Sequence, residues 1–125
     1  MKTLTLNAWG KDHPISFTLN KYADNGNLYV GMLTHEDGFP EPWSDLTVNL
    51  GIECLEGFAF IDTNNNPGII GWLEANNLGK RTYNLVPSGF CMYEEFYFNM
   101  PELLKYTEDE DALYEDLHLE QLEQM

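Results

Sequence analysis

The residues with the best spacing for metal chemistry lie in the segment DTNNNPG at residues 62–68. Asp62, Asn64 and Asn66 match the first, third and fifth oxygen ligands of a calcium-binding loop. The match then fails, because Pro67 stands where the loop needs a glycine and the twelfth position carries no glutamate. Asx turns and helix capping account for the same side chains. We therefore expect no metal ion at this segment.

The residues that could act as zinc ligands or nucleophiles are isolated in the sequence. His13, His35 and His118 lie far apart, no pair has the i, i+4 spacing of a helical zinc site, and we expect all three at the surface. Cys54 and Cys91 belong to no CxxC motif, and an acidic protein disfavours the thiolate, so we expect reduced and buried thiols. No nucleophile elbow or glycine-rich phosphate loop occurs. We expect no catalytic residue and no cofactor, and predict that the protein is not an enzyme.

Negative charge is the strongest chemical signal in the sequence. The 125 residues include 21 acidic and 6 basic residues, which gives a formal net charge of −15. Residues 108–125 contain no Lys or Arg, and such a field repels nucleic acid and anionic membranes and favours basic protein surfaces. We predict a basic protein surface as the partner, with the carboxylates of this segment as the binding residues. They are Glu108, Asp109, Glu110, Asp111, Glu115, Asp116, Glu120 and Glu123.

The acidic segment has two interpretations. As a helix, residues 108–125 would span ~27 Å and carry one carboxylate per ~3.4 Å, close to the phosphate spacing along one strand of B-DNA. This spacing is compatible with a DNA mimic that binds a nucleic-acid-binding protein. Alternatively, the segment is a solvated amphipathic helix that docks through Leu113, Tyr114 and Leu117, or that only keeps the protein soluble.

Strict alternation of polar and apolar residues predicts an antiparallel meander in the first half of the chain. We expect a turn over residues 10–14, a type I′ turn at Asn25-Gly26 and a long loop over residues 34–43. The four expected strands are residues 3–9, 15–19, 28–32 and 46–50. Their side chains expected in the core are Leu4, Leu6, Ile15, Phe17, Val30 and Val48.

The pattern of residues in the second half of the sequence predicts one main helix packed on the sheet. Residues 67–77 carry a helical apolar stripe, with Asn66 as the expected N-cap, Pro67 at the first helical position and Gly79 ending the helix. Thr107-x-x-Glu110 is a capping-box pattern that would open the acidic helix. The other expected elements are extended segments at 58–61, 81–87 and 90–100 and a short helix at 101–106. The predicted fold class is therefore α+β, with a domain at 1–107 and an acidic helical extension at 108–125.

Composition is consistent with a single folded domain. Hydrophobic residues make up 43% of the chain, which is enough to build a core, and the longest apolar runs are far shorter than the ~20 residues of a membrane span. The N-terminus carries no apolar stretch typical of a secretory signal. We therefore expect a cytoplasmic protein that binds neither membrane nor nucleic acid.

Three stretches carry a resemblance to a known family: EPWSDLTVNLG at 41–51, FIDTNNNPGIIGWLEANNLG at 60–79 and SGFCMYEEFYFN at 88–99. They resemble an uncharacterised family of small bacterial proteins, a domain of unknown function carried on conjugative or integrative elements of gut bacteria. The resemblance covers residues 1–107 and implies no catalytic residues. It implies an accessory protein of a mobile element, a class that includes antagonists of host restriction or CRISPR machinery.

Charge and resemblance together lead to one functional hypothesis and one alternative. The hypothesis is a non-enzymatic accessory protein of a mobile genetic element that binds a basic partner, with a nucleic-acid-binding host-defence protein as the candidate that it would inhibit. The alternative is a structural or protein-interaction module whose acidity only maintains solubility.

Overall fold

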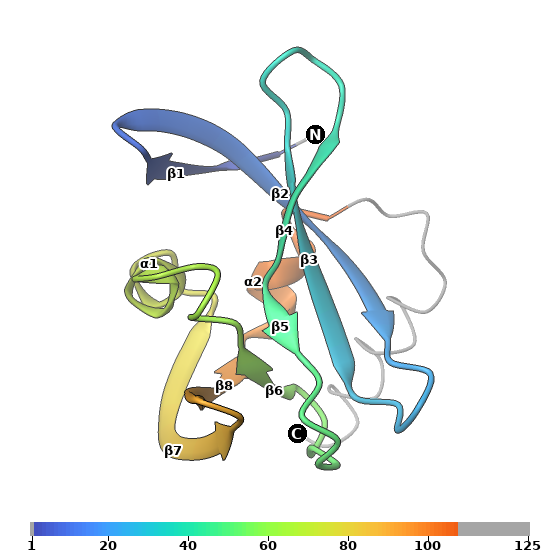
Figure 1. The fold of residues 1–125 in the computed structure, drawn as a ribbon. Coiled ribbons are helices and arrows are strands. Elements are labelled where there is room, and N and C mark those ends of the chain that lie inside the picture. Colours follow the sequence, from blue (N-terminus) through green and yellow to red (C-terminus); the bar gives the residue numbers. More distant parts are fainter. Residues whose placement is uncertain (1, 108–125) are drawn as a thin grey trace.

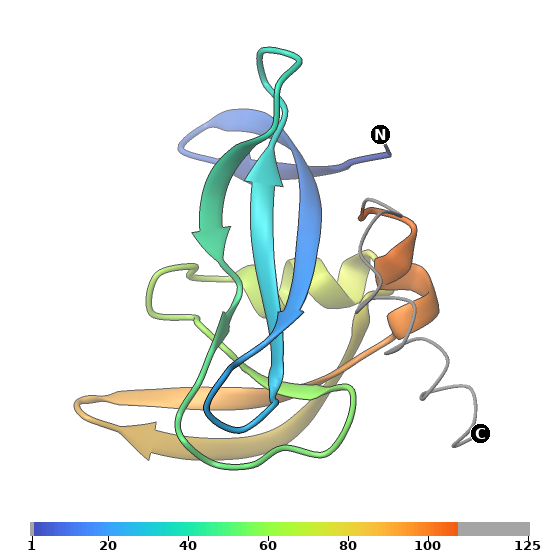
Figure 2. The same cartoon turned by 90° about the vertical axis from the view of Figure 1, so that its right-hand side faces the viewer.

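A computed structural model describes residues 2–107 of the chain, and the predicted acidic helix at 108–125 lies outside the described residues. Within this range the strands form two four-stranded antiparallel sheets, in the orders β1-β2-β3-β4 and β5-β6-β8-β7 (Figure 1). Two short helices accompany them, so the described part is α+β with far more strand than helix. The strands of the two sheets run across one another, with α1 beside both (Figure 2).

The first sheet confirms the predicted antiparallel meander for its first three strands, and a fourth antiparallel strand completes it. Alternation places Ile15, Phe17 and Val30 in the core, whereas Leu4 and Leu6 are only partly buried against it. The strands are β1 (Leu4–Ala8), β2 (Lys11–Lys21), β3 (Leu28–Thr34) and β4 (Glu41–Asp45).

Both predicted turns of this sheet need correction. The turn expected over residues 10–14 is confined to Trp9 and Gly10, and β2 already begins at Lys11. At Asn25-Gly26 only the glycine has a positive φ, of 73°, so the turn is not type I′. The connection is instead longer, because the N–H of Tyr22 donates to the carbonyl of Asn27 at 2.9 Å.

The predicted fourth strand is wrong in position. Strand β4 covers residues 41–45, and its first three residues belong to the segment 34–43. We expected that segment to be a loop because of its prolines and acids. Pro42 is tolerated there because β4 is the edge strand of its sheet, where a missing N–H costs no ladder hydrogen bond. Within the predicted strand 46–50, Thr47–Val48 form β5 of the second sheet, and Val48 is partly exposed rather than in the core.

The chain passes from one sheet to the other at Leu46. Its N–H donates to the carbonyl of Val30 in β3 and its carbonyl accepts from the N–H of Asp62 after β6, both at 2.9 Å, and its side chain is fully buried. The expectation of a single sheet is therefore corrected to two sheets joined at a corner, as in orthogonal packings. The remaining strands of the second sheet are β6 (Phe58–Ile61), β7 (Gly79–Ser88) and β8 (Cys91–Phe98).

Helix α1 (Ile69–Ala75) is shorter than the predicted 67–77. Its N-cap is Gly68, at a φ of 79°, rather than Asn66. The left-handed residue after the helix is Asn77, at a φ of 60°, rather than Gly79. The apolar stripe itself is as predicted, because its isoleucines and Leu73 are buried against the sheets.

Gly79 instead begins β7, where it permits a close approach of two strands. A Cβ at this position would collide with the carbonyl oxygen of Tyr97 and lie 2.5 Å from the ring of Phe96. The residue is therefore a packing requirement of the second sheet rather than a helix stop.

The end of the described chain contacts β2 of the first sheet. After α2 (Met100–Leu104), the carbonyl of Tyr106 accepts a hydrogen bond of 2.8 Å from the N–H of Phe17, and Thr107 forms a parallel bridge with the same residue. Phe17, at 1% exposure, is thus held through its backbone by the last described residues and through its side chain by the core.

Candidate functional site

All three tryptophans of the chain line one groove. Trp9 comes from the turn between β1 and β2, Trp43 from β4 and Trp72 from α1, so two sheet elements and the helix build the site together. The groove has a volume of about 580 Å³, and its lining residues come from the β1–β2 hairpin, β4, the loop before α1 and α1 itself. Among residues 2–107, none of those that line it is charged. Its size and its aromatic and amide lining are typical of a binding site for a small ligand or an extended segment.

Trp9 is the most unusual residue of the groove. Its φ is 53° and that of Gly10 is 73°, the two positive values that a type I′ hairpin turn requires. Asparagine or glycine normally occupies the first of these positions, because a bulky side chain in the left-handed region is strained. The Trp9 side chain is also 89% exposed, with its ring centroid 5.4 Å from that of Trp43.

Trp43 is the extra residue of a β-bulge. Met32 pairs with Ser44 and Leu33 with Pro42, so Trp43 has no partner across the strand. A bulge re-aims a side chain, and here the ring lies against His13, with centroids 4.5 Å apart.

The His13 ring lies next to the rings of Trp9 and Trp43. Its Nδ1 contacts Glu36 Oε1 and its Nε2 lies 3.3 Å from the carbonyl oxygen of Ala8. Both ring nitrogens of His13 thus face oxygen atoms. The hydrogen bond from His13 is also the main cause that lowers the pKa of Glu36 below its usual 4.5. The rings of Trp9 and Trp43 thus both lie beside the His13 ring.

The prediction that His13 lies at the surface is wrong, since its exposure is 6%. His13, Ile15 and Phe17 share the inward face of β2, and the alternation would have shown this had residues 10–14 not been assigned to a turn. His35 is partly buried beside Ser16, with 2.6 Å between its Nε2 and the Ser16 Oγ. His118 lies outside the described residues.

Trp72 forms the fixed wall of the groove. Its Nε1–H donates to the carbonyl oxygen of Thr5 in β1 at 2.8 Å, and its ring lies 6.2 Å from that of Phe17. This hydrogen bond ties α1 to the first sheet. The groove therefore has a rigid side at Trp72 and an exposed side at Trp9.

The segment DTNNNPG contributes to the groove through loop structure. Asp62 accepts hydrogen bonds from the N–H and the side chain of Asn65, at 3.2 and 2.7 Å. The Asn66 side chain donates to the carbonyl oxygens of Asp45 and Asp62, both at 3.0 Å. Its polar groups thus hold the corner between the sheets. Within residues 2–107 no group of three or more His, Cys, Asp and Glu side chains is placed to hold a metal ion.

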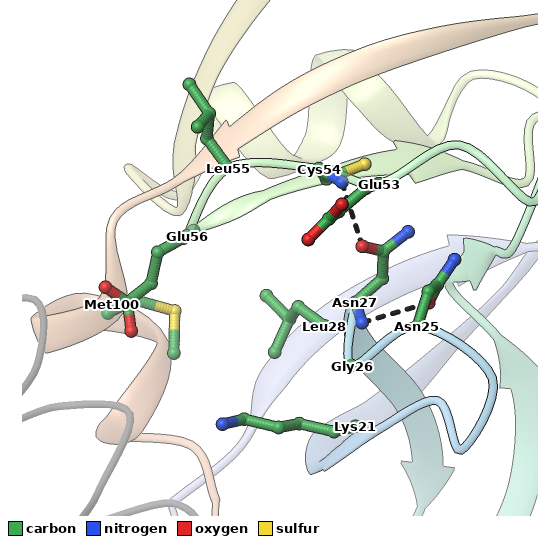
Figure 3. Close-up of a pocket in the computed structure, with 11 residues that line it drawn as sticks. Lys21, Asn25, Gly26, Asn27, Leu28, Glu53, Cys54, Leu55, Glu56 and Met100 are labelled. Atoms are coloured by element: carbon green, nitrogen blue, oxygen red, sulfur yellow. Dashed lines mark hydrogen bonds between the residues drawn. The ribbon is translucent and has the colours of Figure 1, made fainter.

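A second, smaller pocket of about 170 Å³ lies where the β2–β3 turn meets residues 53–57 (Figure 3). Asn27 organises it, donating to the carbonyl of Ile52 at 2.7 Å and accepting from the N–H of Cys54 at 2.9 Å. Burial, and then the charge of Glu95, raise the pKa of the Cys54 thiol, which disfavours a nucleophilic thiolate.

Both cysteines are free and partly exposed, so the expectation that they are fully buried needs correction. The eight carboxylates predicted to bind a partner, Glu108 to Glu123, lie outside the described residues. Sequence reasoning missed the groove itself, because its three tryptophans are distant in the chain and only the fold brings them together.

Fold and groove define a small α+β protein with two antiparallel sheets and a groove lined by three tryptophans. Residues 16–117 match the family described as "Domain of unknown function (DUF4313)", and the chain belongs to this family. The match confirms the expected uncharacterised family, and it includes residues 108–117, which the resemblance described above left out. No curated protein and no solved structure matches the chain. No helix of residues 2–107 is long and apolar enough to cross a membrane.

Proposed function

We propose that the protein is a non-enzymatic binding protein that recognises a basic partner, and that its context is a mobile genetic element of gut bacteria. The observation that carries the proposal is the net charge of −15 on 125 residues. A field of this size accelerates encounter with a positively charged surface and opposes encounter with nucleic acid. A nucleic-acid-binding host-defence protein has the required basic surface, and its inhibition is the activity we propose.

The pattern of ion pairs adds support. The six Lys and Arg residues all lie within residues 2–107, and three of them are paired with carboxylates of the same chain. Arg81 binds Glu94 through two hydrogen bonds, at 2.7 and 2.9 Å, and Lys105 binds Glu102 at 2.8 Å. Half of the few cations are therefore neutralised internally, which leaves the acidic excess to dominate the field.

Affinity capture from a lysate of the host bacterium, at low and high salt, tests this proposal. The intact chain is compared with a variant in which Glu115, Asp116, Glu120 and Glu123 are changed to Gln, which removes charge at nearly constant shape. We expect the intact chain to retain a nucleic-acid-binding protein at low salt and to release it as salt rises, because the Debye length falls from ~30 Å at 0.01 M to ~8 Å at 0.15 M.

The Gln variant should capture markedly less of the same partner. Equal capture by both chains with equal salt dependence would mean that the acidic segment only maintains solubility. Capture of no basic protein under any salt condition would refute the proposal as a whole.

A further inference from the structure

We propose that the exposed faces of Trp9 and Trp43 are the docking point for an arginine-bearing segment of the basic partner. The proposal rests on the proposed function, because it assigns a recognition site for the same partner. This inference differs from the proposed function in the site: it places specific recognition of the partner in the groove rather than in the acidic segment.

The first argument is the placement of Trp9. A ring of this size that is 89% exposed leaves a large apolar surface in water, and its backbone is in the left-handed region besides. Asparagine at the same position would form the same turn without strain. The fold therefore maintains an exposed indole at the mouth of a groove, where a ligand can cover it.

The second argument is the chemistry of the pair. The indole face is the best aromatic partner for a cation, and a guanidinium stacks on it while its N–H groups remain free to bind carboxylates. The His13 ring already lies next to both indoles, with its centroid 6.5 Å from that of Trp9 and 4.5 Å from that of Trp43. Elsewhere in the fold, Lys2 lies over the ring of Tyr106 at 5.4 Å.

The third argument is charge complementarity next to the groove. Glu36 contacts His13 beneath the tryptophans, Asp37 follows it, and Glu41 lies on β4 two residues before Trp43. All three residues are exposed, and Glu36 is also paired with Lys11 at 3.5 Å. An uncharged aromatic groove with Glu36 next to its His13, in a protein of net charge −15, fits an arginine better than it fits an anion or a purely apolar segment.

Titration of the full chain with three peptides tests the proposal: nona-arginine, nona-lysine and deca-proline. The indole N–H signals of the three tryptophans report where each peptide binds, and the affinity is measured in parallel by fluorescence anisotropy of the labelled peptide. The decisive variant is Trp9→Asn, which removes the ring and keeps a residue suited to the turn. Phe90→Asn is the matched control, because Phe90 is fully exposed on the distant β7–β8 turn.

We expect nona-arginine to shift the Trp9 and Trp43 signals and to bind more tightly than nona-lysine. Trp9→Asn should weaken its binding about fivefold or more, the effect of losing one cation–π contact of about 1 kcal/mol, and Phe90→Asn should not.

Tight binding of nona-arginine that is unaffected by Trp9→Asn would overturn the inference and leave the proposed function standing. Indole shifts with deca-proline but not with nona-arginine would overturn it in favour of a neutral proline-rich ligand. No binding of either basic peptide at low salt would refute both proposals together.

Discussion

At the scale of single residues, the groove combines strain with exposure. A left-handed backbone at a non-glycine residue costs of order 1–3 kcal/mol, and such residues gather at functional sites. Trp9 combines a left-handed backbone, at a φ of 53°, with a side chain that is 89% exposed. Stability and binding are therefore expected to respond to this residue in opposite directions.

Trp9→Asn should leave the free energy of unfolding unchanged or raise it by up to about 1 kcal/mol. The relief of strain outweighs the loss of the contact with Trp43, because aromatic pairs contribute only about 0.5–1.5 kcal/mol beyond burial. Urea denaturation of both chains measures the difference. A loss of more than about 1 kcal/mol would show that the ring is structural.

The two glycines Gly79 and Gly71 form a matched pair for a second test. Gly79→Ala should destabilise the protein by about 2 kcal/mol or more, because the added Cβ meets the Tyr97 carbonyl oxygen and the ring of Phe96. Gly71→Ala lies in α1 with nothing within 4 Å, and should stabilise the protein by up to about 1 kcal/mol. Thermal unfolding of the two variants should shift in opposite directions. Equal shifts would contradict the role assigned to Gly79.

A third residue provides a test in alkaline solution. The Tyr29 hydroxyl donates to Asp45 at 2.6 Å, and burial together with this hydrogen bond raises its pKa to about 12. The folded state therefore favours the neutral phenol, so this contribution to stability is complete below pH 10 and is lost as the pH rises towards 12. Tyr29→Phe should remove the highest-pH part of the tyrosine absorbance titration. An unchanged titration curve would contradict this.

At the scale of elements, the sequence pattern predicts the strands well where alternation is regular and fails where the chain turns between sheets. Strands β1 to β3 follow from the alternation that puts Ile15, Phe17 and Val30 on one face. Strand β4 carries two acids and Pro42, a composition typical of loops, and it is a strand only because β3 offers it an edge. Tertiary pairing overrides local propensity there.

The groove could not be predicted for a related reason. A sequence reveals the tryptophans but not the corner at Leu46, and this corner brings β4 and the loop before α1 together. His13 is different, because its place in the β2 alternation was visible in the sequence.

The contact of residues 106–107 with β2 predicts where the chain can be shortened. A chain that ends after Thr107 keeps the hydrogen bond from Phe17 to Tyr106, so its amide of Phe17 should remain protected in hydrogen exchange. A chain that ends after Leu104 loses this hydrogen bond and the buried Tyr106 ring, and it should unfold at lower denaturant concentration. Equal stability of the two chains would show that the contact contributes nothing.

At the scale of the whole molecule, the charge acts on stability as well as on binding. Deleting residues 108–125 changes the formal net charge from −15 to −7. Self-repulsion destabilises a compact state of high net charge, and salt screens it. Raising the salt from 0.01 to 0.15 M should therefore raise the Tm of the full chain more than that of the chain ending after Thr107. Calorimetry compares the two, and an equal rise would mean that the segment contributes no repulsion.

The hydrogen bond between Phe17 and Tyr106 also has a consequence for the protein's synthesis. Its partners are separated by 89 positions, so this hydrogen bond cannot form until Tyr106 has been synthesised. At bacterial rates of roughly 5–20 residues per second, the part of the second strand that β1 does not pair waits about 4–18 s with its outer edge uncovered. During that interval the nascent chain presents an open strand edge, the surface on which unfinished β proteins join one another. Synthesis of Tyr106 thus sets the earliest time at which this stretch of strand edge can be covered.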